Sequence, residues 1–142
     1  MNHTEQITID DQIIAVIIYS EFNKEGIEFF TPGDFSQQLG YMKHKKGDAI
    51  QEHKHVLHKR EIKYTQETLF VKSGRVKVNF YTDDNKYFTN RELKTGDVIL
   101  LASGGHGFEF LEETEMIEVK QGPYVSDKDK VRFKCDKNDT GQ

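Results

Sequence analysis

Short runs of apolar and β-branched residues, separated by Gly, Asp and Asn, make up most of this chain. Hardly any segment has the 3.6-residue period of an amphipathic helix. Runs of this kind are typical of antiparallel strands joined by tight turns. The pattern therefore predicts an all-β sandwich or barrel, with strands over residues 12–20, 26–30, 66–74, 75–82, 86–93, 97–103 and 114–122.

Two turns are predicted between consecutive strands. Gly74, in the sequence KSGR, supplies the positive φ that a hairpin turn requires, and the sequence TDDNK (residues 82–86) predicts a second hairpin. The first 12 residues and residues 126–142 are polar and offer few core candidates, so both are expected to be frayed ends or arms.

Length, charge and cysteine content narrow the class of protein. With 142 residues, of which 35% are hydrophobic, the chain predicts a single domain spanning residues 1–142. The net charge is -4, and acidic and basic residues alternate along the chain, which argues against nucleic acid as a partner. Cys135 is the only cysteine and the longest apolar run, IIAVII, has six residues, so we expect a cytoplasmic protein without disulfides or membrane spans.

Three histidines and one carboxylate form a candidate metal site. His53 and His55 would point to the same side of a strand, because residues two apart share a face. Glu67 shares its predicted face with apolar residues, where a carboxylate is costly to bury unless it is paired, and His106 shares its face with Phe108 and Phe110. This ligand set suits a divalent transition metal, namely Zn, Mn, Fe or Ni, without choosing among them.

The spacing of these residues resembles that of the cupins, a family of small metal-binding barrels. The family's first motif begins with a glycine, five residues and His-x-His, which matches Gly47 followed by His53-Lys54-His55. The motif ends with a glutamate, six residues and a glycine, which matches Glu67 and Gly74. Gly96 and Gly104 match the second motif within GDVILLASGGHGFEF, where His106 is the only available histidine and lies one residue early, and Ala102 stands in place of the family's proline. The resemblance covers residues 47–122, and implies a double-stranded β-helix (jelly-roll) fold with a barrel core over about residues 40–122 and His53, His55, Glu67 and His106 as metal ligands.

The chain departs from the family pattern between the histidines and the carboxylate. Eleven residues separate His55 from Glu67, where the family usually has three or four, so either a loop is inserted or Glu61 is the ligand. Glu67 alone keeps the spacing to Gly74. His58 falls off the face shared by His53 and His55, so we interpret it as a loop residue.

The resemblance also implies a function. The arrangement is similar to small bacterial cupins of nucleotide-sugar and surface-polysaccharide metabolism, which implies a polar, sugar-like substrate and Lewis-acid metal chemistry of the isomerase or epimerase kind. A non-catalytic metal-binding or small-molecule-binding module and an iron-dependent dioxygenase are the alternatives, and catalysis itself stays open because no separate acid or base stands out. Candidate groups for an anionic part of the ligand are Arg60, Lys63, Tyr64 and Lys120.

The N-terminal apolar run suggests an assembly. QIIAVIIYS is more apolar than a solvent-facing edge strand should be, so it is either buried within the chain or paired across a subunit boundary. We expect a two-fold homodimer in which some of the first 45 residues pack on the other chain.

Overall fold

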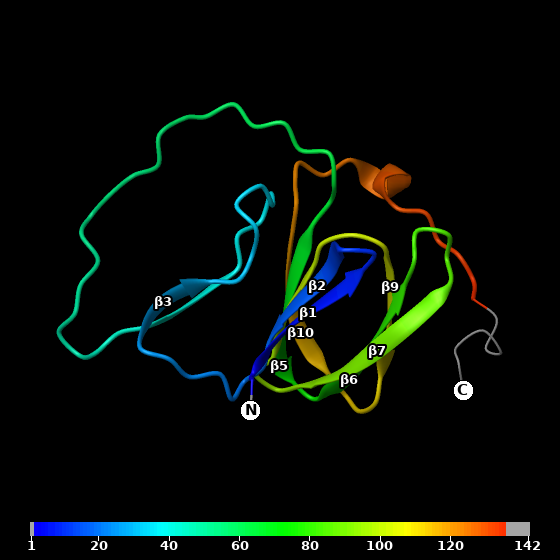
Figure 1. Cartoon of the computed structure of the whole chain (residues 1–142), viewed down its shortest axis with the longest axis horizontal. Coiled ribbons are helices and arrows are strands. Elements are labelled where there is room, and N and C mark those ends of the chain that lie inside the picture. The colour runs from blue at the N-terminus through cyan, green and yellow to red at the C-terminus, as the bar shows by residue number, and fades with distance from the viewer. Residues whose placement is uncertain (1, 136–142) are drawn as a thin grey trace.

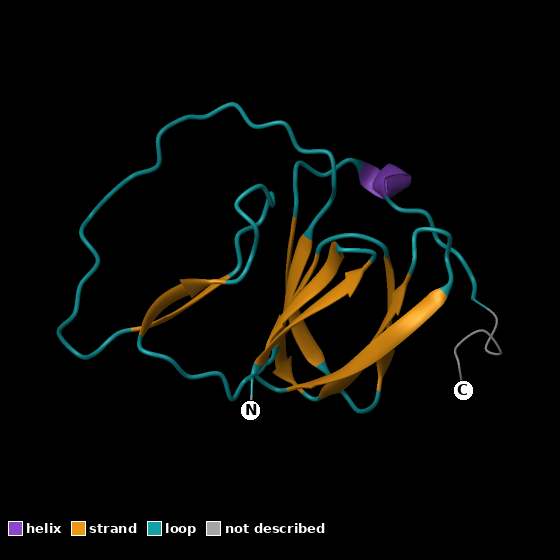
Figure 2. Cartoon of the chain, viewed as in Figure 1, coloured by secondary structure: helices purple, strands orange, loops and turns teal. Residues whose placement is uncertain are grey.

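The computed structural model describes residues 2–135, and they form an all-β fold of antiparallel strands (Figure 2). A five-stranded sheet has the order β1-β2-β8-β5-β10 and a three-stranded sheet the order β7-β6-β9. The five strands of the first sheet are β1 (Thr4–Ile9), β2 (Gln12–Ile18), β8 (Val98–Leu101), β5 (Glu67–Ser73) and β10 (Glu115–Lys120). Those of the second are β7 (Tyr87–Lys94), β6 (Arg75–Tyr81) and β9 (Gly105–Phe110).

The two sheets pack on one main core. Their inward-facing residues alternate along each strand, as in β6, where every second side chain is fully buried. The core includes Leu69 and Ile99 from the five-stranded sheet and Val78 and Phe80 from the three-stranded sheet. The sheets do not close into a barrel, because no pairing joins an edge strand of one to an edge strand of the other among the described residues.

The apolar run near the N-terminus is buried within its own chain. β2 lies between β1 and β8, and Ala15 and Ile17 are fully buried. β1 was not expected, since the first 12 residues were predicted to fray. It is an edge strand in which only Ile7 is buried, and the turn that joins it to β2 places Asp10 and Asp11 at positive φ, as a two-residue hairpin turn requires.

Of the two predicted hairpins, one is confirmed. β6 and β7 pair directly across the turn at residues 82–86, which Asn85 closes at a positive φ of 67°. Gly74 does connect consecutive strands at a φ of 101°, but β5 and β6 belong to different sheets and do not pair. The prediction of a hairpin there was wrong, because alternation in a sequence marks a strand without identifying its neighbours.

A second, smaller cluster lies on the outer face of the five-stranded sheet. Residues 30–39 cross this face, where Phe30, Phe35 and Leu39 pack on Val16, Leu100 and Ala102. The buried side chain of Gln66 accepts hydrogen bonds from Ser36 Oγ at 3.2 Å and Gln37 N at 3.0 Å. The loop is therefore fixed to the sheet by both apolar and polar contacts.

A hairpin and a long loop project from this outer face. The hairpin pairs β3 (Gly26–Phe29) with β4 (Gly40–Lys43) and forms its own two-stranded sheet. The projecting segment, defined as residues 44–64, follows β4 and curves away from the sheets before the chain returns at β5 (Figure 1). The projecting segment contains no strand. The expectation that His53 and His55 lie on a strand is therefore wrong within a single chain.

Residues 126–135 differ from the frayed arm that their polarity predicts. A short 3-10 helix, η1 (Ser126–Asp129), follows β10, and the Phe133 ring packs edge-on against Tyr81 with ring centroids 5.2 Å apart. This contact holds the C-terminal segment, residues 129–135, beside β9. Residues 136–142 of the predicted arm lie outside the described residues.

Candidate functional site

Glu67 and His106 come together between the two sheets. Glu67 opens β5 and His106 is the second residue of β9, and His106 Nε2 lies 2.7 Å from Glu67 Oε1. His106 is opposite Phe80 on β6, which points into the core, and Glu67 shares its face with buried Leu69 and Val71. Both side chains therefore face inward, as the alternation along the sequence predicts.

The electrostatic setting keeps Glu67 ionised. Its hydrogen bond with His106 is the main cause that lowers the pKa of the carboxyl group, and partial burial opposes this effect. The positive charge of Lys120 lowers the pKa further. A charged carboxylate beside an imidazole is a donor pair that a transition-metal ion accepts.

This pair lines a cavity of about 620 Å³ between β5, β9, β10 and the C-terminal segment. Its polar lining includes Glu118 and Lys120 from β10 and Lys130 and Arg132 from the C-terminal segment. Tyr81 and Cys135 also contribute to its wall. The size is within the range of cavities that hold small ligands.

His53 and His55, the other two predicted ligands, do not reach this pair within one chain. Both are exposed in the projecting segment, with their ring centroids 5.4 Å apart, and His53 Nδ1 lies 2.8 Å from Gln51 O. Across residues 2–135, no three His, Cys, Asp or Glu side chains gather closely enough to hold a metal ion.

The carboxylate that meets a histidine is Glu67, not Glu61. Glu61 is exposed and lies with Arg60, Lys63 and Tyr64 along a different cavity, on the outer face of the five-stranded sheet. His58 is exposed in the projecting segment. The spacing to Gly74 thus selects the glutamate that approaches His106.

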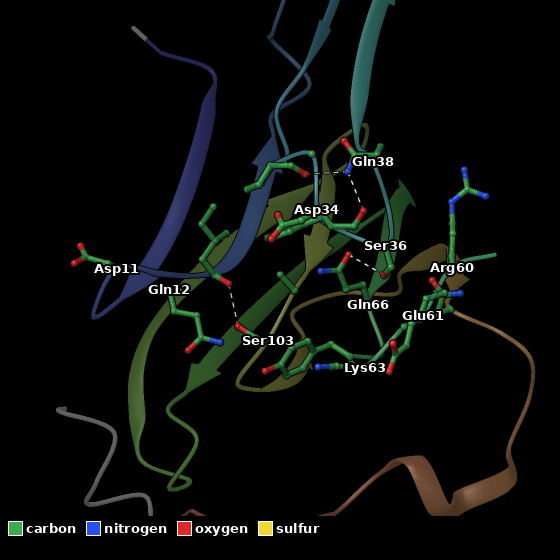
Figure 3. A pocket seen from close by; sticks show the side chains of 18 residues that line it. Asp11, Gln12, Asp34, Ser36, Gln38, Arg60, Glu61, Lys63, Gln66 and Ser103 are labelled. Atoms are coloured by element: carbon green, nitrogen blue, oxygen red, sulfur yellow. Dashed lines mark hydrogen bonds between the residues drawn. The ribbon is translucent and has the colours of Figure 1, made fainter. Parts of the chain in front are cut away.

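The outer cavity, shown in Figure 3, has a volume of about 1170 Å³. The end of the projecting segment forms one side of it, and the loop that contains Ser36 and Gln38 forms another. Arg60, Lys63 and Tyr64 were expected at the mouth of the metal site, but here they line this separate space. Of the four predicted ligand-binding residues, only Lys120 lies beside Glu67 and His106.

Sequence reasoning missed the C-terminal contribution to the inner cavity. Lys130, Arg132 and Phe133 lie in a stretch that composition marks as a polar tail. The alternation of cationic and apolar residues in KVRFK was the available signal, because it suggests a segment with one face toward the protein.

Comparison with known proteins does not assign this chain to a family. No family model, curated protein or solved structure matches this chain. Among the residues that the structure describes, no helix has the length and apolar character needed to cross a membrane.

Proposed function

We propose that this protein is a metal-binding cupin with a double-stranded β-helix core, and that it acts on a small polar, sugar-like ligand. The contact between Glu67 and His106 at 2.7 Å, facing a cavity of about 620 Å³, carries this proposal. The contact lies between two antiparallel sheets, which supports the proposal, while among the described residues the sheets do not close into a barrel. The coarser finding, an all-β fold, stands independently of it.

The donor set fits a divalent transition metal. Glu67 offers carboxylate oxygens and His106 an imidazole nitrogen, and His53 and His55 are the two further imidazoles of the motif. Such an ion, when bound, supplies Lewis-acid chemistry. Glu67 and His106, which both line the cavity, would hold it there.

Three cations of the cavity are placed to bind an anionic group of the ligand. Lys120 lies on β10 opposite Glu67, and Lys130 and Arg132 line the same space from the C-terminal segment. A phosphate or carboxylate held by these groups would orient the rest of the ligand toward Glu67 and His106. Nucleotide sugars and sugar phosphates have this combination of anionic and polyhydroxyl parts.

A binding module without catalysis is the second candidate, and one observation favours it. The C-terminal segment forms part of the wall of the cavity, where Phe133 packs on Tyr81. A segment in that position restricts the exchange of ligands, as suits a protein that retains a small molecule.

Metal analysis of protein purified without a nickel column tests the proposal. The wild-type protein should contain close to one transition-metal ion per chain, and Glu67→Gln and His106→Gln should each lose most of it. His3→Gln and His58→Gln serve as matched controls and should keep the metal. A wild-type protein that contains none after growth with added Zn, Mn, Fe or Ni would overturn the proposal.

A screen of ligands then separates the two candidate functions. Nucleotide sugars and sugar phosphates are compared for a shift in melting temperature and for conversion of the ligand. Binding with turnover favours the enzyme, and binding without turnover favours the module. Lys120→Met and Arg132→Gln should weaken binding of the anionic ligand while leaving the metal content unchanged.

A further inference from the structure

Two adjacent strands of this fold have open edges. β9 ends the three-stranded sheet and β10 ends the five-stranded sheet, and no strand within residues 2–135 pairs with the outer edge of either. Ile117 and Val119 on β10 are 53% and 61% exposed, and Phe110 on β9 is 58% exposed. An open edge with apolar side chains beside it is a template for another strand.

The projecting segment has no strand partner among residues 2–135, and it exposes several large apolar side chains. Its exposed apolar residues are Ile50, Val56, Leu57, Ile62 and Tyr64. The hairpin from which it departs exposes Ile27, Phe29 and Met42 as well. Apolar surface on this scale usually marks a contact with another molecule.

The charges of the two surfaces are complementary. Residues 44–64 contain six Lys or Arg and three Asp or Glu, whereas residues 105–120, which form β9, β10 and their connection, contain five Glu and one Lys. The segment is therefore net positive and the open edges net negative. Opposite charge of this kind favours association and selects its orientation.

The candidate metal site lacks further imidazole donors, and the projecting segment contains two. Glu67 and His106 supply two donors, and the exposed His53 and His55 are two more. His106 and Phe108 point inward from β9, since they lie opposite Phe80 and Val78, which are fully buried. A strand added to the outer edge of β9 would also turn alternate residues inward, so His53 and His55 could both face His106.

We propose that two copies of the chain exchange their projecting segments. The segment of each copy lies along the open edge of β9 in the other, and His53 and His55 of one copy complete the metal site of Glu67 and His106 in the other. This inference rests on the proposed metal site for its ligands, but the exchange itself rests on the open edges, the exposed apolar residues and the charges.

The geometry favours a second copy over folding back of the same chain. Residues 30–39 are fixed to the outer face of the five-stranded sheet, by Phe35 and Leu39 and by the hydrogen bonds to Gln66. The β3–β4 hairpin then directs the segment away from that face, while β9 lies beyond the opposite face (Figure 1). In a two-fold dimer, each departing segment meets the other copy's edge, and both are covered at once.

Mixed dimers test the exchange through metal content, independently of any activity. One chain carries His53→Ala and His55→Ala, the other carries Glu67→Gln and His106→Gln, and two different non-histidine tags isolate the heterodimer. With exchange, the intact histidines of the second chain meet the intact pair of the first, so the heterodimer should bind one metal ion. Each doubly substituted homodimer should bind close to none and the wild-type dimer two.

If each site is built from a single chain, the heterodimer binds no metal and the exchange is overturned. The companion variant replaces residues 46–62 by a short Gly-Ser linker, and its mass is measured by light scattering beside the wild type. A wild-type dimer and a monomeric variant support the exchange even if no metal is bound, in which case only the proposed function fails. A dimeric variant, or a monomeric wild type at micromolar concentration, overturns the exchange.

Discussion

Arg91 donates hydrogen bonds to both carboxylate oxygens of Glu5, over distances of 2.6 to 3.0 Å. Glu5 is on β1 and Arg91 on β7, so the pair joins the two sheets at their edge opposite β9 and β10. Tyr19 Oη donates to the same carboxylate at 2.8 Å. A two-pronged contact between sheets is a stronger restraint than an exposed ion pair.

Removing this pair should destabilise the fold. Arg91→Met should lower the free energy of unfolding by about 1–2 kcal/mol, since the hydrogen bonds are charge-assisted but the side chains are only partly buried. Urea denaturation at pH 7 with a chelator measures the change. Lys86→Met, which removes an exposed pair with Asp84, is the matched control and should change it by less than about 0.5 kcal/mol.

The same pair predicts a loss of stability in acid. The hydrogen bond from Arg91 is the main cause that lowers the pKa of Glu5 below its ordinary value of 4.5. Because the folded-state pKa is the lower one, the contribution of Glu5 is fully present above the unfolded value and disappears as the pH falls through the folded value. The difference in unfolding free energy between wild type and Glu5→Gln should therefore shrink below pH 4.5. A difference that stays constant between pH 7 and pH 3 would contradict this.

Glu67 should depend on His106 even without metal. In protein freed of metal with a chelator, His106→Ala removes the partner of a partly buried carboxylate. The change should lower the free energy of unfolding by about 1–2 kcal/mol. Adding Glu67→Gln to that variant removes the unpaired charge and should recover part of the loss. Urea denaturation of the two single variants and the double variant forms the cycle. Additive effects would show that the two side chains do not interact in solution.

Asp97 should be among the most sensitive polar positions. It is 1% exposed, and its carboxylate accepts hydrogen bonds from Ser20 N at 2.8 Å and Lys94 N at 2.7 Å. Asp97→Ala leaves both donors unsatisfied and should destabilise the protein by about 2–4 kcal/mol. Asp97→Asn retains one acceptor oxygen and should cost less. Equal losses in the two variants would mean that side-chain volume, not hydrogen bonding, determines the effect.

Gly74 should tolerate no side chain. It has a φ of 101°, and a Cβ there would collide with the backbone of Glu113 and with Thr114. Gly74→Ala should therefore lower stability by about 2 kcal/mol or more. At Gly33, where a Cβ would meet open space, alanine should have a small effect by comparison. Comparing the shifts in denaturation midpoint of Gly74→Ala and Gly33→Ala measures how strongly the backbone at Gly74, which connects the two sheets, requires glycine.

Much of the fold could be predicted from alternation alone. Seven predicted strands are confirmed, since runs such as RVKVNFY place every second residue in the core. β1, β4 and β9 were not among the seven, because edge and hairpin strands bury few residues and their sequences carry a weak apolar signal. The change of sheet at Gly74 could not be predicted, because strand pairing depends on distant residues.

The candidate site could also be predicted only in part. The inward orientation of Glu67 and His106 follows from neighbours two residues away, and the structure brings the two together. The location of His53 and His55 depends on what covers residues 44–64, which no local pattern specifies. Lys130 and Arg132 line the cavity from a segment whose Phe133 packs on Tyr81, a pairing of residues distant in sequence.

The central place of β2 has a consequence for the order of events during synthesis. β1 and β2 emerge from the ribosome before the other strands of this fold, yet the strand that flanks β2 on its other side is β8, which emerges much later. The isoleucine-rich stretch of β2 must therefore remain without this neighbour until β8 has been made, and a run of this composition is prone to aggregate when exposed. A chaperone that shields residues 12–18 until β8 is complete would raise the yield of native protein more than one that acts on the finished chain.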